Sequence, residues 1–148
     1  MIHVRAFAER DFDDLVGRWH ATNRAAYAYV AEQRAHTLGE ARLFFRGGIL
    51  AQCRVFVAAQ AQRRLGLVAI EGEWIRQFAV FAPFRRRGIG SALLARAREC
   101  SPARLRLYTF QRNTAARAFY DHHGFNVVAF GTSPAPEHEP DVEYLWQA

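Results

Sequence analysis

The chain has 148 residues, of which 51% are hydrophobic, and a formal net charge of +6. This length and composition exclude a disordered chain, and they predict a single domain over residues 1–148 that is large enough to bury a core. No apolar run is long enough for a membrane span, and the first residues lack the apolar segment of a signal peptide, so we expect no membrane association.

The basic and sulfur-containing residues narrow the function further. All twenty basic residues are arginine, and a basic balance is typical of nucleic-acid-binding proteins. However, the arginines are scattered, their only dense cluster is Arg85–Arg87, and no nucleic-acid-binding motif is present. Cys53 and Cys100 lack metal-binding spacing, so we expect reduced thiols, no metal and a cytoplasmic protein.

Apolar periodicity and turn residues predict the following elements in chain order. They are a strand Ile2–Phe7, a helix from Asp11 to about Tyr27, a helix from Thr37, strands 53–59, 65–70 and Trp74–Val80, a helix Gly90–Cys100, a strand Arg104–Phe110, a helix Thr114–His123, a strand Phe125–Phe130, a Pro-rich loop 131–140 and a strand Val142–Trp146. The order β-α-α-β-β-β-α-β-α-β-β predicts a mixed sheet with helices on its faces, which is α/β or α+β in class.

Local signals within these elements make sharper predictions. Thr37 followed by Glu40 is a capping box that opens the second helix, and Gly47-Gly48 should fray or end that helix. In the strand 53–59, alternate residues are expected to face inward.

The segment 74–92, WIRQFAVFAPFRRRGIGSA, reads as a strand, a basic glycine-rich loop and a helix N-terminus. This arrangement binds a diphosphate through backbone N–H groups and the positive end of the helix dipole. Glycine at 88 and 90 lets the backbone approach the phosphate oxygens. The loop is not a P-loop, because no Gly-Lys-Ser/Thr follows, and Leu93 replaces the third glycine of a dinucleotide fingerprint.

A second motif lies in residues 105–125, LRLYTFQRNTAARAFYDHHGF. Asn113 is a suitable N-cap, and Gly124 suits the left-handed position that ends a helix. Asn113 and Tyr120 are two helical turns apart and therefore share a face.

Together the two motifs resemble the GCN5-related N-acetyltransferases. Arg85, Gly88 and Gly90 match the acetyl-CoA-binding motif Arg/Gln-x-x-Gly-x-Gly/Ala of that family. The downstream residues Asn113, Ala116, Phe119, Tyr120, Gly124 and Phe125 match its C-terminal signature. The resemblance implies that strands 74–80 and 104–110 are parallel neighbours that splay apart, with the pantetheine arm of CoA between them.

The resemblance also implies a cofactor site for acetyl-CoA as cosubstrate. The diphosphate would bind the loop formed by Arg85, Arg86, Arg87, Gly88, Ile89, Gly90 and Ser91, which would also explain the basic cluster. The pantetheine arm would pair with the backbone of Phe78, Ala79 and Val80, and Asn113 and Phe119 would contact it. For Asn113 the alternative is a purely structural N-cap.

By the same resemblance, the reaction is direct transfer of acetyl to a primary amine of a small molecule or peptide. Tyr120 matches the general acid that protonates the departing thiolate, with core packing as its alternative role. Many family members place a glutamate six residues before Val80, but Trp74 stands there, and Glu73 would face the other side unless a bulge intervenes. Glu73 and Asp141 are the candidate bases, with Glu143 and a water chain as rivals.

The acceptor is less well specified. By analogy, the first two helices and the loop 131–141 would wall its site. Glu137, Glu139, Asp141 and Glu143 would attract a protonated amine there, unless they form only a solvated edge. His122 and His123 are expected to cap a helix end. A catalytically silent CoA-binding regulator is the main alternative, a nucleic-acid-binding module is less favoured, and a homodimer is compatible with the sequence.

Overall fold

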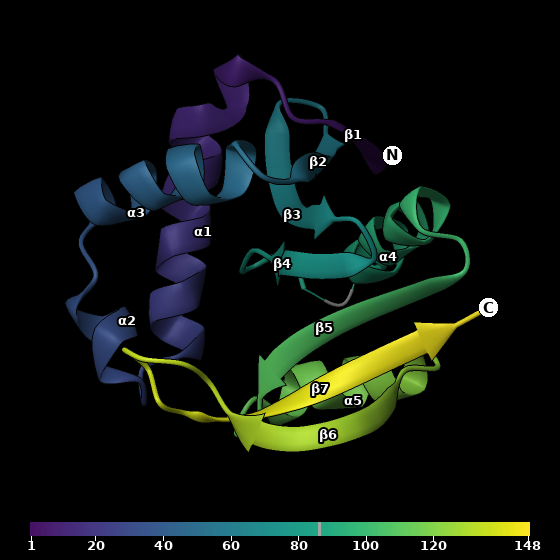
Figure 1. Cartoon of the computed structure of the whole chain (residues 1–148). Helices are drawn as coiled ribbons and strands as arrows, with labels where there is room; N and C mark the ends of the chain where they lie inside the picture. Colours follow the sequence, from purple (N-terminus) through teal and green to yellow (C-terminus); the bar gives the residue numbers. More distant parts are fainter. Residues whose placement is uncertain (86) are drawn as a thin grey trace.

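The computed structural model describes residues 1–85 and 87–148, with all their side chains except those at positions 32 and 34. Within these residues, seven strands form one mixed sheet in the order β1-β2-β3-β4-β5-β7-β6 (Figure 1). The strands are β1 (His3–Ala6), β2 (Arg54–Gln60), β3 (Arg63–Glu71), β4 (Trp74–Val80), β5 (Arg104–Phe110), β6 (Asn126–Thr132) and β7 (Pro140–Gln147). The predicted mixed α/β class is confirmed.

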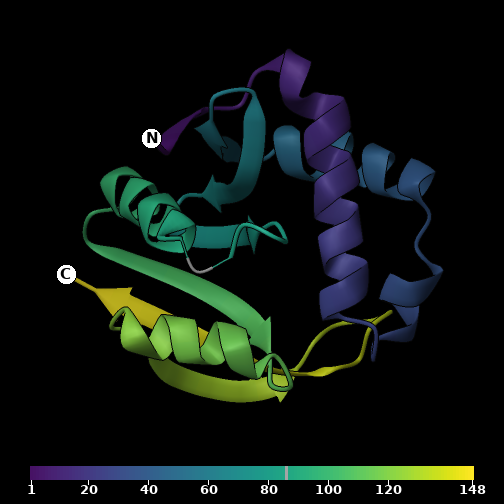
Figure 2. The same ribbon diagram turned by 180° about the vertical axis from the view of Figure 1, so that it is seen from behind.

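The helices lie between the strands along the chain, in nearly the predicted order. They are α1 (Phe12–Ala26), α2 (Ala31–Ala35), α3 (Leu38–Phe44), α4 (Ile89–Cys100) and α5 (Thr114–His122), with a short 3-10 helix η1 (Glu9–Asp11) before α1 and a π-helix η2 (Phe45–Leu50) after α3. Helix α4 packs against β2 and β3, and α1 packs against β3 and α3. The reverse view places α4 and α5 along the two strands β4 and β5 (Figure 2). No helix in the described residues is long and apolar enough to cross a bilayer.

The sheet divides between β4 and β5. Over the described residues, their only pairing is Trp74 with Arg106, where the Arg106 N–H also donates to the Glu73 carbonyl at 2.8 Å. All other neighbouring strands pair in antiparallel fashion along most of their lengths. The predicted splay of two parallel strands is therefore confirmed, and the two half-sheets open away from this bridge.

Two local predictions need correction. The helix does not end at Gly47-Gly48 but continues as η2, because Phe45 and Ile49 are buried in the core and packing outweighs glycine propensity. In β2, every residue from Val55 to Ala59 is buried rather than alternate ones, since α4 and η2 both pack against this strand. The capping box that opens α3 is confirmed.

Asp11 ties the N-terminal strand, α1 and β3 together. Its side chain is fully buried and accepts hydrogen bonds from Arg5 (2.8 Å to each oxygen), Arg64 Nε (2.7 Å) and the Ala8 N–H (2.8 Å). Burial alone would raise the pKa of Asp11, but these hydrogen bonds outweigh it and hold the pKa well below its ordinary value.

We expect Asp11→Ala to lower the free energy of unfolding by about 3–5 kcal/mol, because it leaves two guanidinium groups without their buried partner. Since the folded-state pKa is depressed, this contribution is present above the unfolded pKa of about 3.9 and is lost as the pH falls toward the folded value. Urea unfolding of the wild type and of Asp11→Ala at pH 7 measures this difference in the free energy of unfolding. Asp13→Ala, which breaks an exposed pair with Arg42, should cost less than about 1 kcal/mol. Equal losses in the two variants would contradict this role for Asp11.

Candidate functional site

In the described part of the chain, two cavities open along the divide between β4 and β5. The larger cavity, of about 980 Å³, is bounded by β4, the loop 85–91, α4 and α5. The smaller cavity, of about 750 Å³, is bounded by α1, β5, β6 and the loop before β7. Both are lined by Asn23, Tyr27, Arg76, Gln77, Tyr108 and Thr109. Because they share these lining residues, the two cavities are adjacent.

The glycine-rich loop contributes the N-terminus of α4 to the larger cavity. Gly88 is the N-cap with φ +79°, a left-handed conformation that favours glycine. Gly90 has a different requirement, because a Cβ there would lie 2.9 Å from the Phe119 ring of α5. The close approach of α4 and α5 thus depends on Gly90. Ile89 and Ser91 also line this cavity.

The two described arginines of the loop have different positions. Arg85 lines the larger cavity, and its Nε donates to the Val80 carbonyl at 3.4 Å. Arg87 is not among the lining residues, and its guanidinium lies 5.9 Å from the Phe84 ring. The expectation for Arg86 falls outside the described residues.

The edge of β4 that faces the divide has free backbone groups. β4 bulges at Arg76, where its register with β3 shifts by one residue. The Phe81 N–H donates to the Leu65 carbonyl of β3 at 2.9 Å. In an antiparallel pair every second residue directs its backbone groups toward the partner strand, so the amides of Phe78 and Val80 point away from β3. These amides, with Ala79 between them, therefore line the larger cavity as an unpaired edge.

The bulge does not bring Glu73 into either cavity. Glu73 lies in the turn before β4, where its Oε2 accepts a hydrogen bond from Arg106 Nε at 2.5 Å. Arg106 also donates to Glu143 at 3.2 Å. Because Glu73 lines neither cavity and its carboxylate is engaged with Arg106, its position favours the interpretation as a structural ion pair.

Tyr120 and Asn113 lie together on the wall of the larger cavity, as their spacing predicts. Tyr120 is only 6% exposed, and its ring centroid lies 6.0 Å from that of Phe78. Burial raises the pKa of its hydroxyl. Asn113 Oδ1 accepts from the Ala116 N–H at 3.2 Å, which confirms the N-cap, and its Nδ2 donates to the Tyr27 hydroxyl at 3.4 Å.

Two contacts at this site were not anticipated from the sequence. Tyr27 lines both cavities, and because Asn113 donates to its oxygen, its own hydroxyl proton is free to point elsewhere. His123 donates from Nδ1 to the Phe119 carbonyl (2.9 Å), while its Nε2 lies 3.0 Å from Ser91 Oγ. His123 thus connects the end of α5 to the glycine-rich loop, beyond the capping role expected for it. Neither contact has a local sequence signal, because each joins residues far apart in the chain.

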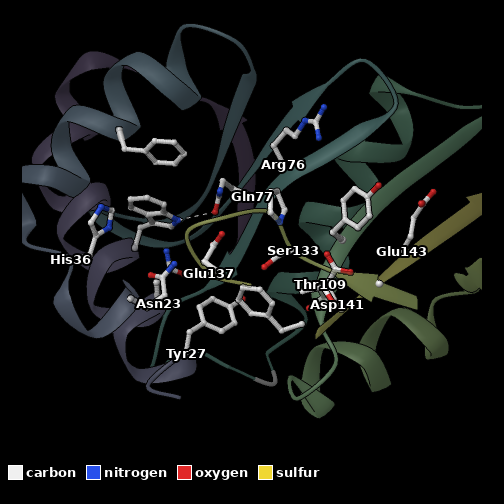
Figure 3. Close-up of a pocket in the computed structure, with 18 of the residues that line it drawn as sticks. Asn23, Tyr27, His36, Arg76, Gln77, Thr109, Ser133, Glu137, Asp141 and Glu143 are labelled. Atoms are coloured by element: carbon white, nitrogen blue, oxygen red, sulfur yellow. Dashed lines mark hydrogen bonds between the residues drawn. The ribbon is translucent and has the colours of Figure 1, made fainter. Parts of the chain in front are cut away.

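The smaller cavity carries carboxylates from the end of the chain (Figure 3). Asp141 is 8% exposed, and its carboxylate forms no ion pair with any described residue. Its pKa is raised, chiefly by burial and also by the nearby Glu143. Glu137 and Glu143 line the same cavity, whereas Glu139 does not: its buried side chain pairs with Arg112 at 3.0 Å. Of the four acidic residues expected at this site, Glu137, Asp141 and Glu143 therefore line the cavity and Glu139 does not.

Comparison with known proteins accounts for this arrangement. The family model described as an acetyltransferase (GNAT) domain matches residues 51–127, which is more than half of the chain. The chain belongs to the GNAT acetyltransferase family. The matched segment contains every residue predicted to contact the cofactor, whereas Asp141 of the smaller cavity lies beyond it. No curated protein matches the chain.

Solved structures show the same GNAT fold over nearly the whole length. The apo form of YjaB from Escherichia coli is 20% identical, with a TM-score of 0.81 over 99% of this chain and 97% of that one. PaiA N-acetyltransferase from Thermoplasma acidophilum, solved with coenzyme A, is 14% identical, with a TM-score of 0.72 over 100% and 99%. The ribosomal-protein-S18-alanine N-acetyltransferase from Escherichia coli is 20% identical, with a TM-score of 0.68 over 99% and 94%.

Proposed function

We propose that this GNAT chain transfers an acetyl group from acetyl-CoA to a primary amine of a small molecule or peptide by direct attack. The observation that carries the proposal is the junction of the two cavities. One cavity combines a helix N-terminus, a free strand edge and a buried phenol, and the other presents an unpaired carboxylate. PaiA N-acetyltransferase, which shares the fold, was solved with coenzyme A, and this supports a CoA site here.

The cofactor would lie along the larger cavity. Backbone N–H groups of Gly88–Ser91 and the dipole of the twelve-residue helix α4 suit the diphosphate, and Arg85 adds a positive charge. The free amides of Phe78 and Val80 suit the pantetheine arm, as an added strand would pair. The Val80 N–H then lies near the thioester, where it can stabilise the tetrahedral oxyanion.

Tyr120 would assist departure of the thiolate. When the amine nitrogen bonds to the thioester carbon, the C–S bond breaks and sulfur takes up the electron pair. The Tyr120 hydroxyl stays protonated because burial raises its pKa, and the same burial disfavours a free thiolate. It therefore donates a hydrogen bond to the developing thiolate and finally transfers its proton to the sulfur. The proton of the amine passes to the general base.

Asp141 would hold the incoming ammonium and accept its proton. An alkyl ammonium with a pKa near 10.4 needs about 4–5 kcal/mol to be neutral at pH 7. A carboxylate with a raised pKa and no competing guanidinium is the better proton acceptor, which favours Asp141 over the Arg106-bound Glu73.

Thiol release from acetyl-CoA over a library of primary amines tests the proposal. We expect release that depends on the amine and is matched by N-acetylated product. If acetyl-CoA binds but no amine elicits thiol release, the chain is a CoA-binding regulator instead. If a polynucleotide binds with steep salt dependence while acetyl-CoA does not bind, the nucleic-acid hypothesis holds.

A weaker acceptor interaction is expected when the carboxylates of the smaller cavity are neutralised. Asp141→Asn and Glu137→Gln should each raise the acceptor KM by roughly 3–30-fold, and added salt should raise it for the wild type. The acetyl-CoA Kd should hardly change. Steady-state kinetics at two ionic strengths measure this, with Glu99→Gln on α4 as a control that removes an equal charge outside both cavities. If the acceptor KM is unchanged in both variants and by added salt, these carboxylates are not part of the substrate site.

A further inference from the structure

The charged groups of the smaller cavity are arranged for a cation and against an anion. Three carboxylates line it, and Asp141 is a buried carboxylate without a cationic partner among the described residues. Such a group is costly to bury and is stabilised when a ligand supplies the missing positive charge.

The one guanidinium in the described lining is partly engaged by the protein itself. Arg76 is the guanidinium of this lining, and it is already engaged: its Nε donates to Glu71 at 3.0 Å, and its guanidinium lies 5.1 Å from the Trp74 ring. The other basic groups of the described lining are the imidazoles of His20 and His36. For His20, burial, followed by Arg24 and His36, lowers the pKa and keeps the ring neutral.

The rest of the cavity is suited to an apolar body. Trp19 and Phe44 stack with ring centroids 6.4 Å apart, and Tyr27 and Phe110 form an edge-to-face pair at 5.1 Å. The Trp19 indole N–H is occupied by Gln77 at 3.2 Å, so the Trp19 ring offers carbon surface and no free donor. Such surfaces bind flat or aliphatic carbon groups by area burial.

We propose that the acceptor is a primary amine on an aromatic or aliphatic body with no carboxylate next to the amine, rather than an α-amino acid. The proposal rests on the proposed function and defines its substrate class. An ammonium beside Asp141 would place an α-carboxylate within a few ångströms of the unpaired Asp141 carboxylate, in a cavity that Glu137 and the Arg106-bound Glu143 also line. Like charges at that distance in a partly buried site repel strongly, so the amino acid should be rejected by charge and not by size.

Matched ligands test this charge discrimination. Phenethylamine with phenylalanine, tyramine with tyrosine, and isobutylamine with valine are pairs that differ in one carboxylate. We expect kcat/KM for each amine to exceed that for the amino acid of the same pair by roughly 10²–10³-fold. Tyrosinamide has the size of tyrosine but no negative charge, and it should fall within about tenfold of tyramine.

Variants locate the discrimination in the cavity. Glu137→Gln should narrow the ratio of amine to amino acid by roughly 3–10-fold, whereas Glu99→Gln, which also removes one negative charge, should leave it unchanged. An amino acid used as well as its amine, or a tyrosinamide as poor as tyrosine, would overturn the inference.

A binding measurement separates this inference from the proposed function. Calorimetric titration of the same pairs into the protein saturated with CoA measures ligand binding to the smaller cavity in the absence of turnover. Binding of an amine but not of its amino acid supports the inference even if no thiol is ever released, which would contradict only the acetyl transfer. If no amine of the three pairs binds at millimolar concentration, the inference is wrong.

Discussion

Replacing Tyr120 by phenylalanine is expected to lower kcat by about 10²–10⁴-fold, the range typical for loss of a general acid. The substitution keeps the ring, whose centroid lies 6.0 Å from that of Phe78, and removes only the hydroxyl of a residue that lines the larger cavity. The acetyl-CoA Kd should stay within about threefold, because the phosphate and pantetheine contacts lie elsewhere. Steady-state kinetics with a verified acceptor, together with calorimetry for acetyl-CoA, measure both quantities.

Tyr144 provides a matched control for this variant. It is also a buried tyrosine, its ring lies 5.8 Å from that of Tyr120, and its hydroxyl accepts a hydrogen bond from Arg117 at 3.2 Å outside both cavities. Tyr144→Phe should therefore affect stability by about 1 kcal/mol and hardly affect kcat. Wild-type turnover in Tyr120→Phe would assign Tyr120 to core packing.

Valine at position 88 or 90 is expected to weaken acetyl-CoA binding by at least roughly 10²-fold. At Gly88 the φ of +79° excludes a β-branched residue without strain, and an added side chain would occupy the approach to the helix N-terminus. At Gly90 the side chain would also collide with Phe119 and push α4 away from α5. Arg87→Ala should weaken binding less than about fivefold, since Arg87 lies outside the described lining of the cavity.

Calorimetric titration with acetyl-CoA measures these effects. Gly47→Val is the matched control, because a Cβ at Gly47 meets no atom within 4 Å and Gly47 lies far along the chain from the loop. Gly88→Asn adds a second comparison, since asparagine tolerates the left-handed conformation and should restore part of the affinity if strain dominates. Unchanged affinity in both valine variants would exclude the loop from the cofactor site.

The elements that shape the divide could be predicted closely from the sequence. The predicted strands Trp74–Val80 and Arg104–Phe110 have the observed bounds, and the α5 signals hold, with Asn113 as N-cap and Gly124 at φ +84°. These signals are local, since they depend on caps, turns and apolar runs within a few residues of one another.

What could not be predicted depends on contacts between distant segments. Nothing in the composition of β4 marks the bulge at Arg76, which follows from its pairing with β3. The choice between Glu73 and Asp141 depends on Arg106, a residue of another strand that pairs with Glu73. The exclusion of Glu139 from the cavity likewise depends on Arg112 after β5.

Amide chemical shifts in a ¹⁵N-labelled sample test the two-cavity assignment most directly. Titration with acetyl-CoA is expected to shift the amides of Phe78, Val80 and Gly88–Ser91 to saturation, while those of Ser133 and Glu137 hardly change. Subsequent addition of a primary amine should then shift the amides of Ser133, Glu137 and Asp141 and leave those of Gly88–Ser91 near their cofactor-bound positions. Saturation of acetyl-CoA binding without any shift at Gly88–Ser91 would contradict the account.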